Sequence, residues 1–144
     1  MRRKLLLLSL TLLLGACAIP ERAPLPPPIP LRPLNVTTDC NYRDEAGISG
    51  TLRLDVAAAR VRAFEARVNI PQHGSCRFDL RDFRQTKEMP AIELSQPNGS
   101  CIVRMWEQGT RVTVAFQQCE RMCSGSAYDQ LLPMIYDRRD GSCA

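Results

Sequence analysis

The sequence is poor in the residues on which many enzymes rely. It contains one histidine, His73, and one tryptophan, Trp106, and only 6% of its residues are aromatic. A Ser-His-Asp or Cys-His relay would therefore have to pass through His73, and the turn-like segment 71–74 predicts an exposed loop histidine instead. Ser124 lacks the Gly-x-Ser-x-Gly frame of a nucleophile elbow, and segment 124–126 is expected to be a turn. We assign no catalytic residue.

The carboxylates show no spacing that indicates a site. Asp79, Asp82, Glu88 and Glu93 are spread along one stretch without the pattern of a calcium loop or of a paired acid and base. We therefore expect them to be surface charges. The sequence predicts no metal site and no cofactor.

Basic residues are in excess only at the N-terminus. The net charge is +4, but removing residues 1–16 takes away Arg2, Arg3 and Lys4 and leaves 16 basic against 15 acidic residues, a net charge of +1. No run of Lys or Arg survives this removal, which argues against nucleic-acid binding. Apart from Lys87, all the basic residues left are arginine, so an arginine-rich anion site is an alternative to a plain bias in composition.

The N-terminus has the pattern of a secretory signal. Residues 1–4 are basic after the initiating methionine, and residues 5–14 are apolar except for Ser9 and Thr11. This apolar run is shorter than the roughly 20 residues that a membrane-spanning helix needs. It is therefore expected to be a cleaved signal peptide and not a membrane span.

The segment Leu14-Gly15-Ala16-Cys17 resembles the bacterial lipobox. The resemblance implies cleavage before Cys17 and attachment of acyl chains such as palmitate, which together anchor the protein in a membrane. Ala18 stands where an aspartate would imply retention in the inner membrane, so the resemblance favours the outer membrane, with the domain in the periplasm or at the surface. The alternative is an ordinary secreted protein cut near Ala16 or Ala18.

Seven of the 11 prolines lie between Pro20 and Pro33. Proline fixes φ and lacks an amide proton, so this stretch favours an extended spacer. We expect three parts: a cleaved signal peptide at 1–16, a lipidated cysteine with a proline-rich linker at 17–34, and a disulfide-rich β domain at 35–144.

Six cysteines remain once Cys17 is assigned to lipid. An even number in an oxidising compartment predicts three disulfides. Because Cys119 and Cys123 are four residues apart, a metal site is the competing interpretation, although no paired histidine accompanies them. Six cysteines allow 15 connectivities, and the sequence does not choose among them. The candidates are Cys40, Cys76, Cys101, Cys119, Cys123 and Cys143.

Alternating apolar and polar residues predict two strands, at 51–56 and 64–70. We place a hairpin turn at 57–60, where alanine and arginine make a helix the alternative. Shorter strands are expected at 75–80 and 91–94.

The clearest predicted element is a hairpin formed by 101–107 and 111–117, with Gly109 in its turn. After Cys119 the alternation is lost, and we expect an irregular, disulfide-pinned tail with a short strand or turn around 134–137. The sequence therefore predicts an all-β fold, either a small antiparallel sandwich or a partly closed barrel stapled by disulfides.

Three aromatic residues are binding candidates: Trp106, Tyr128 and Tyr136. Trp106 lies in a predicted strand, where core packing is the commoner fate and a binding anchor is the alternative. The two tyrosines belong to an apolar cluster that either seals one end of the fold or forms a partner-binding patch. This cluster comprises Tyr128, Leu131, Leu132, Met134, Ile135 and Tyr136.

Residues 1–34 resemble bacterial outer-membrane lipoproteins in their signal, lipobox and proline spacer. The domain resembles uncharacterised proteobacterial lipoproteins, a resemblance that implies no activity. It is only loosely similar to the membrane-anchored lysozyme inhibitors, whose inhibitory loop carries a serine and a basic residue. Gly99-Ser100 and segment 124–126 are small-residue turns and no clear counterpart of that loop.

We therefore expect a non-enzymatic binding or accessory lipoprotein of the cell envelope. Its expected partners are the membrane, through the lipid, and an envelope protein or a host lysozyme. Inhibition of lysozyme or of another wall hydrolase is one alternative. The other is an envelope hydrolase that acts through Ser124, Asp79 or Asp82.

Overall fold

The computed structural model describes residues 31–144, which form ten strands and three short 3₁₀ helices. The predicted signal peptide, Cys17 and nearly all of the proline linker lie outside the described residues. No helix within residues 31–144 is long and apolar enough to cross a membrane. The elements are β1 Val36–Arg43, β2 Ser49–Ala57, β3 Arg60–Ile70, β4 Gly74–Asp79, η1 Leu80–Asp82, β5 Arg84–Lys87, β6 Ile92–Ser95, β7 Ile102–Gln108, β8 Arg111–Gln117, η2 Glu120–Met122, η3 Ala127–Gln130, β9 Met134–Asp137 and β10 Ser142–Cys143.

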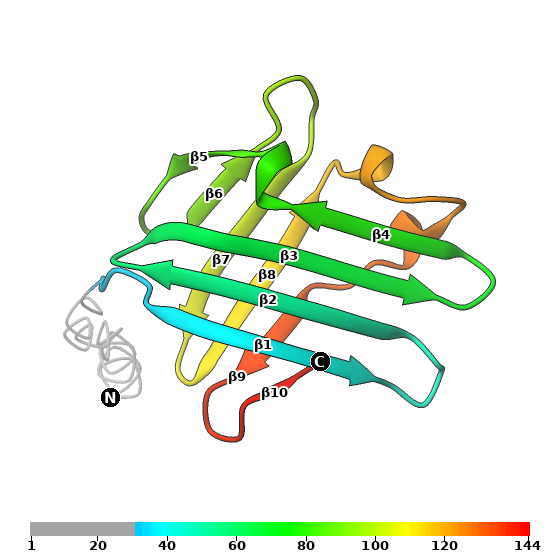
Figure 1. Cartoon of the computed structure of the whole chain (residues 1–144), viewed down its shortest axis with the longest axis horizontal. Helices are drawn as coiled ribbons and strands as arrows, with labels where there is room; N and C mark the ends of the chain where they lie inside the picture. Colours follow the sequence, from blue (N-terminus) through cyan, green and yellow to red (C-terminus); the bar gives the residue numbers. More distant parts are fainter. Residues whose placement is uncertain (1–30) are drawn as a thin grey trace, which may run out of the picture. The chain divides into compact units, whose positions relative to one another are not determined.

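The strands form two antiparallel sheets. One has four strands in the order β1-β2-β3-β4, and the other has six in the order β10-β9-β8-β7-β6-β5. The two sheets lie face to face, and their strands cross (Figure 1). The predicted all-β sandwich is confirmed. The alternative of a partly closed barrel is wrong, because the ten strands remain in two separate sheets.

Alternation along each strand builds the core between the sheets. In β2, Leu52, Leu54 and Val56 are buried while Arg53 is exposed, and in β7 Val103 is buried between half-buried neighbours. Because successive side chains of a strand point to opposite faces, each sheet has one apolar inner face and one polar outer face. The inner faces pack against each other and exclude water.

The hairpin turn predicted at 57–60 is confirmed, although its residues are poor turn formers. Ala58 and Ala59 adopt left-handed backbone conformations with φ of 47° and 63°, which cost free energy for a residue with a Cβ. Their amides are both satisfied: Ala58 N donates to Asn35 Oδ1 at 2.8 Å, and Ala59 N donates to Leu34 O at 2.9 Å. The segment that precedes β1 therefore helps to hold this turn.

The strands predicted at 75–80 and 91–94 are present as β4 and β6, each with bounds that differ by a residue, and the hairpin of 101–117 is present as β7 and β8. In the tail, β9 occupies residues 134–137, as predicted. Strands β1, β5 and β10 and the three 3₁₀ helices were not predicted from the sequence.

The three predicted disulfides form, as Cys40–Cys143, Cys76–Cys123 and Cys101–Cys119. The competing metal interpretation is therefore wrong. Cys40–Cys143 joins β1 to β10, which lie side by side at the edges of the two sheets (Figure 1). Cys76–Cys123 joins the other edge strand, β4, to the tail.

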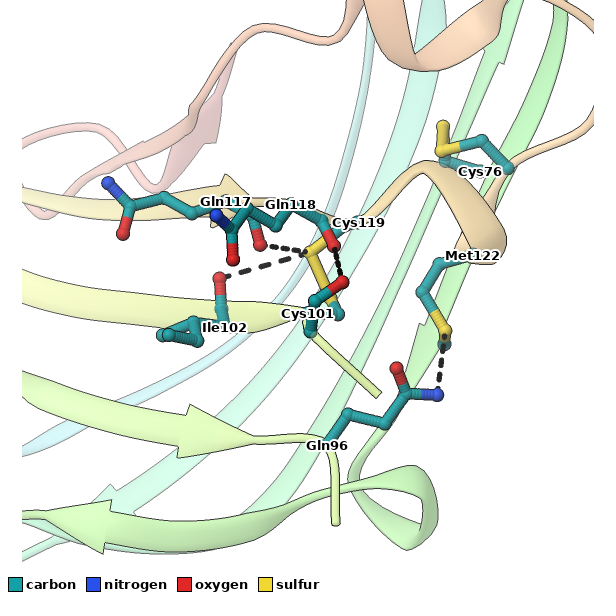
Figure 2. Close-up of a disulfide and its surroundings, with 10 residues drawn as sticks. Cys76, Gln96, Cys101, Ile102, Gln117, Gln118, Cys119 and Met122 are labelled. Carbon is teal, nitrogen blue, oxygen red and sulfur yellow. Dashed lines mark hydrogen bonds between the residues drawn. A yellow bond between two sulfur atoms is a disulfide. The ribbon is translucent and has the colours of Figure 1, made fainter. Parts of the chain in front are cut away.

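The third disulfide lies at the open end of the β7–β8 hairpin. Figure 2 shows Cys119 beside the start of β7, with its sulfur near the carbonyl oxygens of Gln117 and Ile102 at 3.1 and 3.9 Å. Gln96, just after β6, contacts the Met122 sulfur at 3.7 Å. The disulfide therefore fixes the point at which the tail leaves the six-stranded sheet.

Aromatic stacking joins the two sheets inside the core. Phe78 of β4 is fully buried and stacks on Phe116 of β8 with ring centroids 4.1 Å apart. Trp106, in contrast, is half-buried on the outer face of β7, opposite Thr113. The core interpretation of Trp106 is therefore wrong, because the alternation of β7 turns Val103 and Met105 inward instead.

Truncating the two aromatic residues tests this assignment of faces. We expect Phe78→Ala to lower the free energy of unfolding by about 3–5 kcal/mol, because it leaves a cavity in the core. Trp106→Ala should cost about 1 kcal/mol or less. Chemical denaturation of both oxidised variants measures the difference, and equal losses would show that Trp106 belongs to the core.

Asp137 holds the β9–β10 turn and is the only buried charged residue within residues 31–144. Its carboxylate pairs with Arg139 at 2.6 Å and with Arg111 of β8 at 3.6 Å. Hydrogen bonds from the Arg139 side chain and backbone hold the pKa of Asp137 well below its ordinary value of 3.8. The turn therefore depends on the ionised carboxylate.

This arrangement predicts an acid-sensitive stability. A lowered carboxyl pKa contributes stability above the unfolded-state value, and this contribution is lost as the pH falls through the folded-state value. Between about pH 4 and about pH 2 the unfolding free energy of the parent should fall more steeply than that of Asp137→Asn, which is less stable at neutral pH. Parallel curves from denaturant titrations across this range would show that Asp137 is not a source of the stability.

Candidate functional site

An apolar pocket opens where the β1–β2 turn meets the tail, and we call it the tail pocket. Its volume is 280 Å³, close to the lower end of the range for small-molecule sites. Four separate parts of the chain contribute to it: β1 with its following turn, β3, the segment from η3 to β9, and Ala144 after β10. Its lining comprises Tyr42, Asp44, Ile48, Val68, Gln130, Leu132, Pro133, Ile135 and Ala144.

Gly50 determines where the aromatic wall of the pocket lies. A Cβ at residue 50 would overlap the ring of Tyr42, the residue opposite it in the β1–β2 register. Without that carbon, the Tyr42 ring lies against the backbone of β2 and packs on the core. A glycine inside a strand is expected where another group approaches the backbone closely.

Tyr42 and Asp44 bring polar groups to the pocket at the end of β1 and in the turn that follows it. Asp44 closes this turn, because its Oδ1 accepts the amide of Ile48 at 2.9 Å and its own amide donates to Ile48 O at 2.9 Å. Burial, with the charge of Asp44 as a smaller cause, raises the pKa of Tyr42 above 10.0. The Tyr42 hydroxyl therefore keeps its proton at neutral pH and is a potential hydrogen-bond donor.

The tail supplies the opposite wall. The 3₁₀ helix η3 inserts Ala127 into the core, and Leu131 N donates to Tyr128 O at 3.1 Å as the helix ends. Leu132 then leaves the core and is 73% exposed at the pocket. Leu132 therefore extends the apolar lining of the pocket into one continuous apolar surface, and contiguous surfaces of this kind mark binding sites more often than single exposed residues do. The arrangement suits a small apolar group, or an apolar side chain of a partner.

The predicted apolar cluster of the tail is divided between the two roles considered for it. Met134 is buried, and Tyr128, Leu131 and Tyr136 are half-buried against the core. These four seal the fold. Leu132 and Ile135 line the tail pocket instead. Of the three aromatic candidates, Tyr128 and Tyr136 thus pack on the core, while Trp106 lies on the outer face of the six-stranded sheet.

The four carboxylates considered for acid–base chemistry are not brought together. Asp79 lies on the outer face of β4, where its pKa is lowered to about 2, chiefly by hydrogen bonds from the Arg81 side chain. Glu93 lies on β6 of the other sheet and pairs with Lys87 at 2.8 Å, which lowers its pKa. Glu88 pairs with Arg60 at 3.5 Å, and Asp82 belongs to η1.

His73 meets a serine, although not the one considered from the sequence. Its Nδ1 lies 2.8 Å from Ser126 Oγ, while Ser124 Oγ accepts the amide of Ser75 at 3.0 Å. The amides of Ser126 and Ala127 donate to carbonyl oxygens, so they are not free to bind an oxyanion. These contacts fasten segment 124–126 to the start of β4, and the hydrolase alternative gains no assembled site.

Seven of the nine lining residues were not identified from the sequence as functional, among them Tyr42, Ile48 and Val68. The first two belong to a strand and a turn that were not predicted. Alternation at Val36, Thr38, Cys40 and Tyr42 was the available signal for β1. No local pattern indicated that this strand would face the tail.

No family model, no curated protein and no solved structure matches this chain. Within residues 31–144, no group of three or more His, Cys, Asp or Glu side chains has the arrangement of a metal site.

The exposed leucine gives a direct test of the tail pocket. We expect Leu132→Glu to weaken binding of a neutral naphthylamine dye by about tenfold, because an apolar contact is replaced by a carboxylate near Asp44. Met89→Glu is the matched control, since Met89 is 39% exposed and does not line the pocket. Fluorescence titration measures both, and equal affinities of the two variants would show that the dye binds elsewhere.

Proposed function

We propose that this chain is a lipid-anchored, non-enzymatic binding protein of a bacterial cell envelope. The lipobox resemblance at Cys17 supplies the anchor, and the proline-rich linker supplies a spacer between the membrane and the domain. The membrane in question is the outer membrane, and the partner is an envelope protein. A host lysozyme is the alternative partner.

The cysteine pairing supports the anchor. The chain has seven cysteines, and the six within residues 31–144 all pair with one another. That part of the chain therefore offers no disulfide partner for Cys17. A single cysteine directly after two small residues is the arrangement that the lipobox resemblance predicts.

The tail pocket is the observation that carries the binding role. It joins an apolar surface to an exposed leucine and to the Tyr42 hydroxyl, on a domain whose sheet edges are tied by disulfides. A rigid apolar site loses little conformational entropy when it binds, which favours recognition. Nothing in its lining suggests a reacting nucleophile with a base, so the proposal is one of binding.

One experiment with matched variants tests both halves of the proposal. The full chain is expressed in a Gram-negative host with labelled palmitate, beside Cys17→Ser, Leu132→Glu and Met89→Glu. We expect label in all except Cys17→Ser. After cross-linking in intact cells, a defined adduct with an envelope protein should form with the parent and Met89→Glu and should fall about tenfold with Leu132→Glu.

Two results would contradict the proposal separately. Palmitate label in Cys17→Ser would contradict lipid attachment at Cys17. An equal amount of adduct with Leu132→Glu and with the parent would contradict a binding role for the tail pocket. If no adduct forms, the purified parent is assayed against lysozyme on a cell-wall suspension. Inhibition of lysozyme by the parent but not by Leu132→Glu would favour the lysozyme alternative. If the parent neither forms an adduct nor inhibits lysozyme, the binding proposal has no partner of either class and is contradicted.

A further inference from the structure

The outer face of the four-stranded sheet carries a second hollow that the tail pocket does not explain. Its volume is 550 Å³, within the usual range of ligand sites. It spans all four strands, and its lining includes three arginines, Arg43, Arg67 and Arg77, but no carboxylate. Amide and hydroxyl side chains lie between them, among them Asn41 and Asn69.

The strand register forces two of these arginines together. Arg67 of β3 is the direct cross-strand partner of Arg77 of β4. Residues directly opposite each other on one face have Cβ atoms about 4.5–5.5 Å apart, and like charges in such a pair repel. The sheet therefore keeps a locally unfavourable pair on a face where many polar residues would be tolerated.

Two carboxylates compensate the pair only in part. The charge of Arg77 stabilises the ionised Asp79, two residues further along β4, although the hydrogen bonds of Asp79 go to Arg81. Glu65, two residues before Arg67, accepts hydrogen bonds from its guanidinium at 2.6 and 2.9 Å and lies 4.0 Å from Arg77. Arg43 has no ion-pair partner within residues 31–144. The three arginines thus keep a positive excess over the hollow, while Glu65 holds the Arg67 side chain in place.

The third arginine lies within reach of the same ligand. Arg43 of β1 is opposite Ser49 of β2, which is opposite Asn69 of β3 and then Ser75 of β4. This row of polar side chains runs directly beside the row that contains Arg67 and Arg77. The two rows are two residues, or about 6.6 Å, apart along the strands, and neighbouring strands are about 4.8 Å apart. Arg43 is thus two strands and one row from Arg67, and both side chains line the same hollow.

We propose that this hollow binds a sugar phosphate. A guanidinium presents several N–H donors in a planar fork that matches phosphate oxygens. The amides and hydroxyls of the neighbouring row have donors and acceptors suited to sugar hydroxyls. A free sugar phosphate and the phosphorylated headgroup of a glycolipid share this chemistry. The linings of this hollow and of the tail pocket share Tyr42 and Val68, but the three arginines belong to this hollow alone.

Calorimetric titration of the purified, oxidised protein tests the proposal. The probes are glucose 1-phosphate, inorganic phosphate and glucose. We expect saturable binding of glucose 1-phosphate in the submillimolar to millimolar range, about tenfold weaker binding of inorganic phosphate, and no heat with glucose. No saturable binding of glucose 1-phosphate at about 10 mM would overturn the proposal.

Variants then locate the site. Arg43→Gln and Arg77→Gln should each weaken the binding of glucose 1-phosphate by about tenfold. Arg77→Lys should recover part of the lost affinity, because lysine restores the charge but not the planar fork of N–H donors. Arg62→Gln is the matched control, since Arg62 lies on the same strand as Arg67 but outside the hollow, paired with Asp55 at 2.8 Å. An equal loss of affinity in Arg62→Gln would show that the effect comes from net charge alone, and it would overturn the site.

Vesicles distinguish the source of the phosphate. If the protein binds vesicles that carry a phosphorylated glycolipid, the proposal predicts that glucose 1-phosphate displaces the protein from them. Binding to phosphatidylglycerol vesicles that depends on Arg77, without binding of glucose 1-phosphate, would replace the proposal with a site for a plain phospholipid headgroup. Unchanged unfolding midpoints of the variants would confirm that these effects do not come from unfolding.

Discussion

The disulfides that fasten both edge strands of the four-stranded sheet are the constraint on which the rest of this structure depends. Cys40–Cys143 fastens the first strand to the last across 103 residues of sequence. A cross-link of that span stabilises a chain by about 4–5 kcal/mol in the chain-entropy account. For a domain of this size, which has room for one modest core, that contribution is comparable with the whole net stability.

The fastening of β1 also positions the tail pocket. The pocket has walls from β1 and from the tail, two segments with few hydrogen bonds between them. Cys40–Cys143 holds β1 beside β10, and Ile135 and Ala144 exchange two backbone hydrogen bonds at 2.7 and 2.9 Å. The disulfide thus places the tail against β1. The Tyr42 ring, which packs over Gly50 of β2, lies where β1 and the tail meet. The shape of the tail pocket therefore depends on a covalent restraint.

The polar outer face of the four-stranded sheet is a consequence of the same architecture. Strands β1 to β4 give their apolar residues to the core, so every second residue faces water. Their register decides which charges meet there. It places Arg67 opposite Arg77, and Glu65 lies within ion-pair distance of both. The surface charges are therefore arranged by the fold, although each residue taken alone is ordinary for an exposed strand position.

Local pattern predicted the elements that depend on local interactions. The β7–β8 hairpin and the β2–β3 hairpin follow from strict alternation, whereas around 134–137 the sequence predicted only a short strand or turn. β1 escaped prediction because Thr38 occupies an inward position and polar residues surround Cys40. Trp106 was assigned inward by residue type, whereas the register of β7 turns it outward.

The disulfide pairing and both hollows could not be predicted, because each is made by segments far apart in the sequence. Six cysteines carry no local information about their partners. Tyr42 and Leu132 are brought into one pocket only once the sheets are assembled, and Arg43 and Arg77 into one hollow only by the order of the strands. The resemblance of segment 14–17 to a lipobox, in contrast, rests on a short contiguous pattern, and it stays a prediction from the sequence.

The most direct test of this account is a map of the disulfides. The non-reduced protein is digested, and the linked peptides are identified by mass spectrometry. The account predicts three links, Cys40 to Cys143, Cys76 to Cys123 and Cys101 to Cys119, with Cys17 in none of them. A link from Cys40 or Cys143 to any other cysteine would contradict the fastening of the edge strands and, with it, the tail pocket.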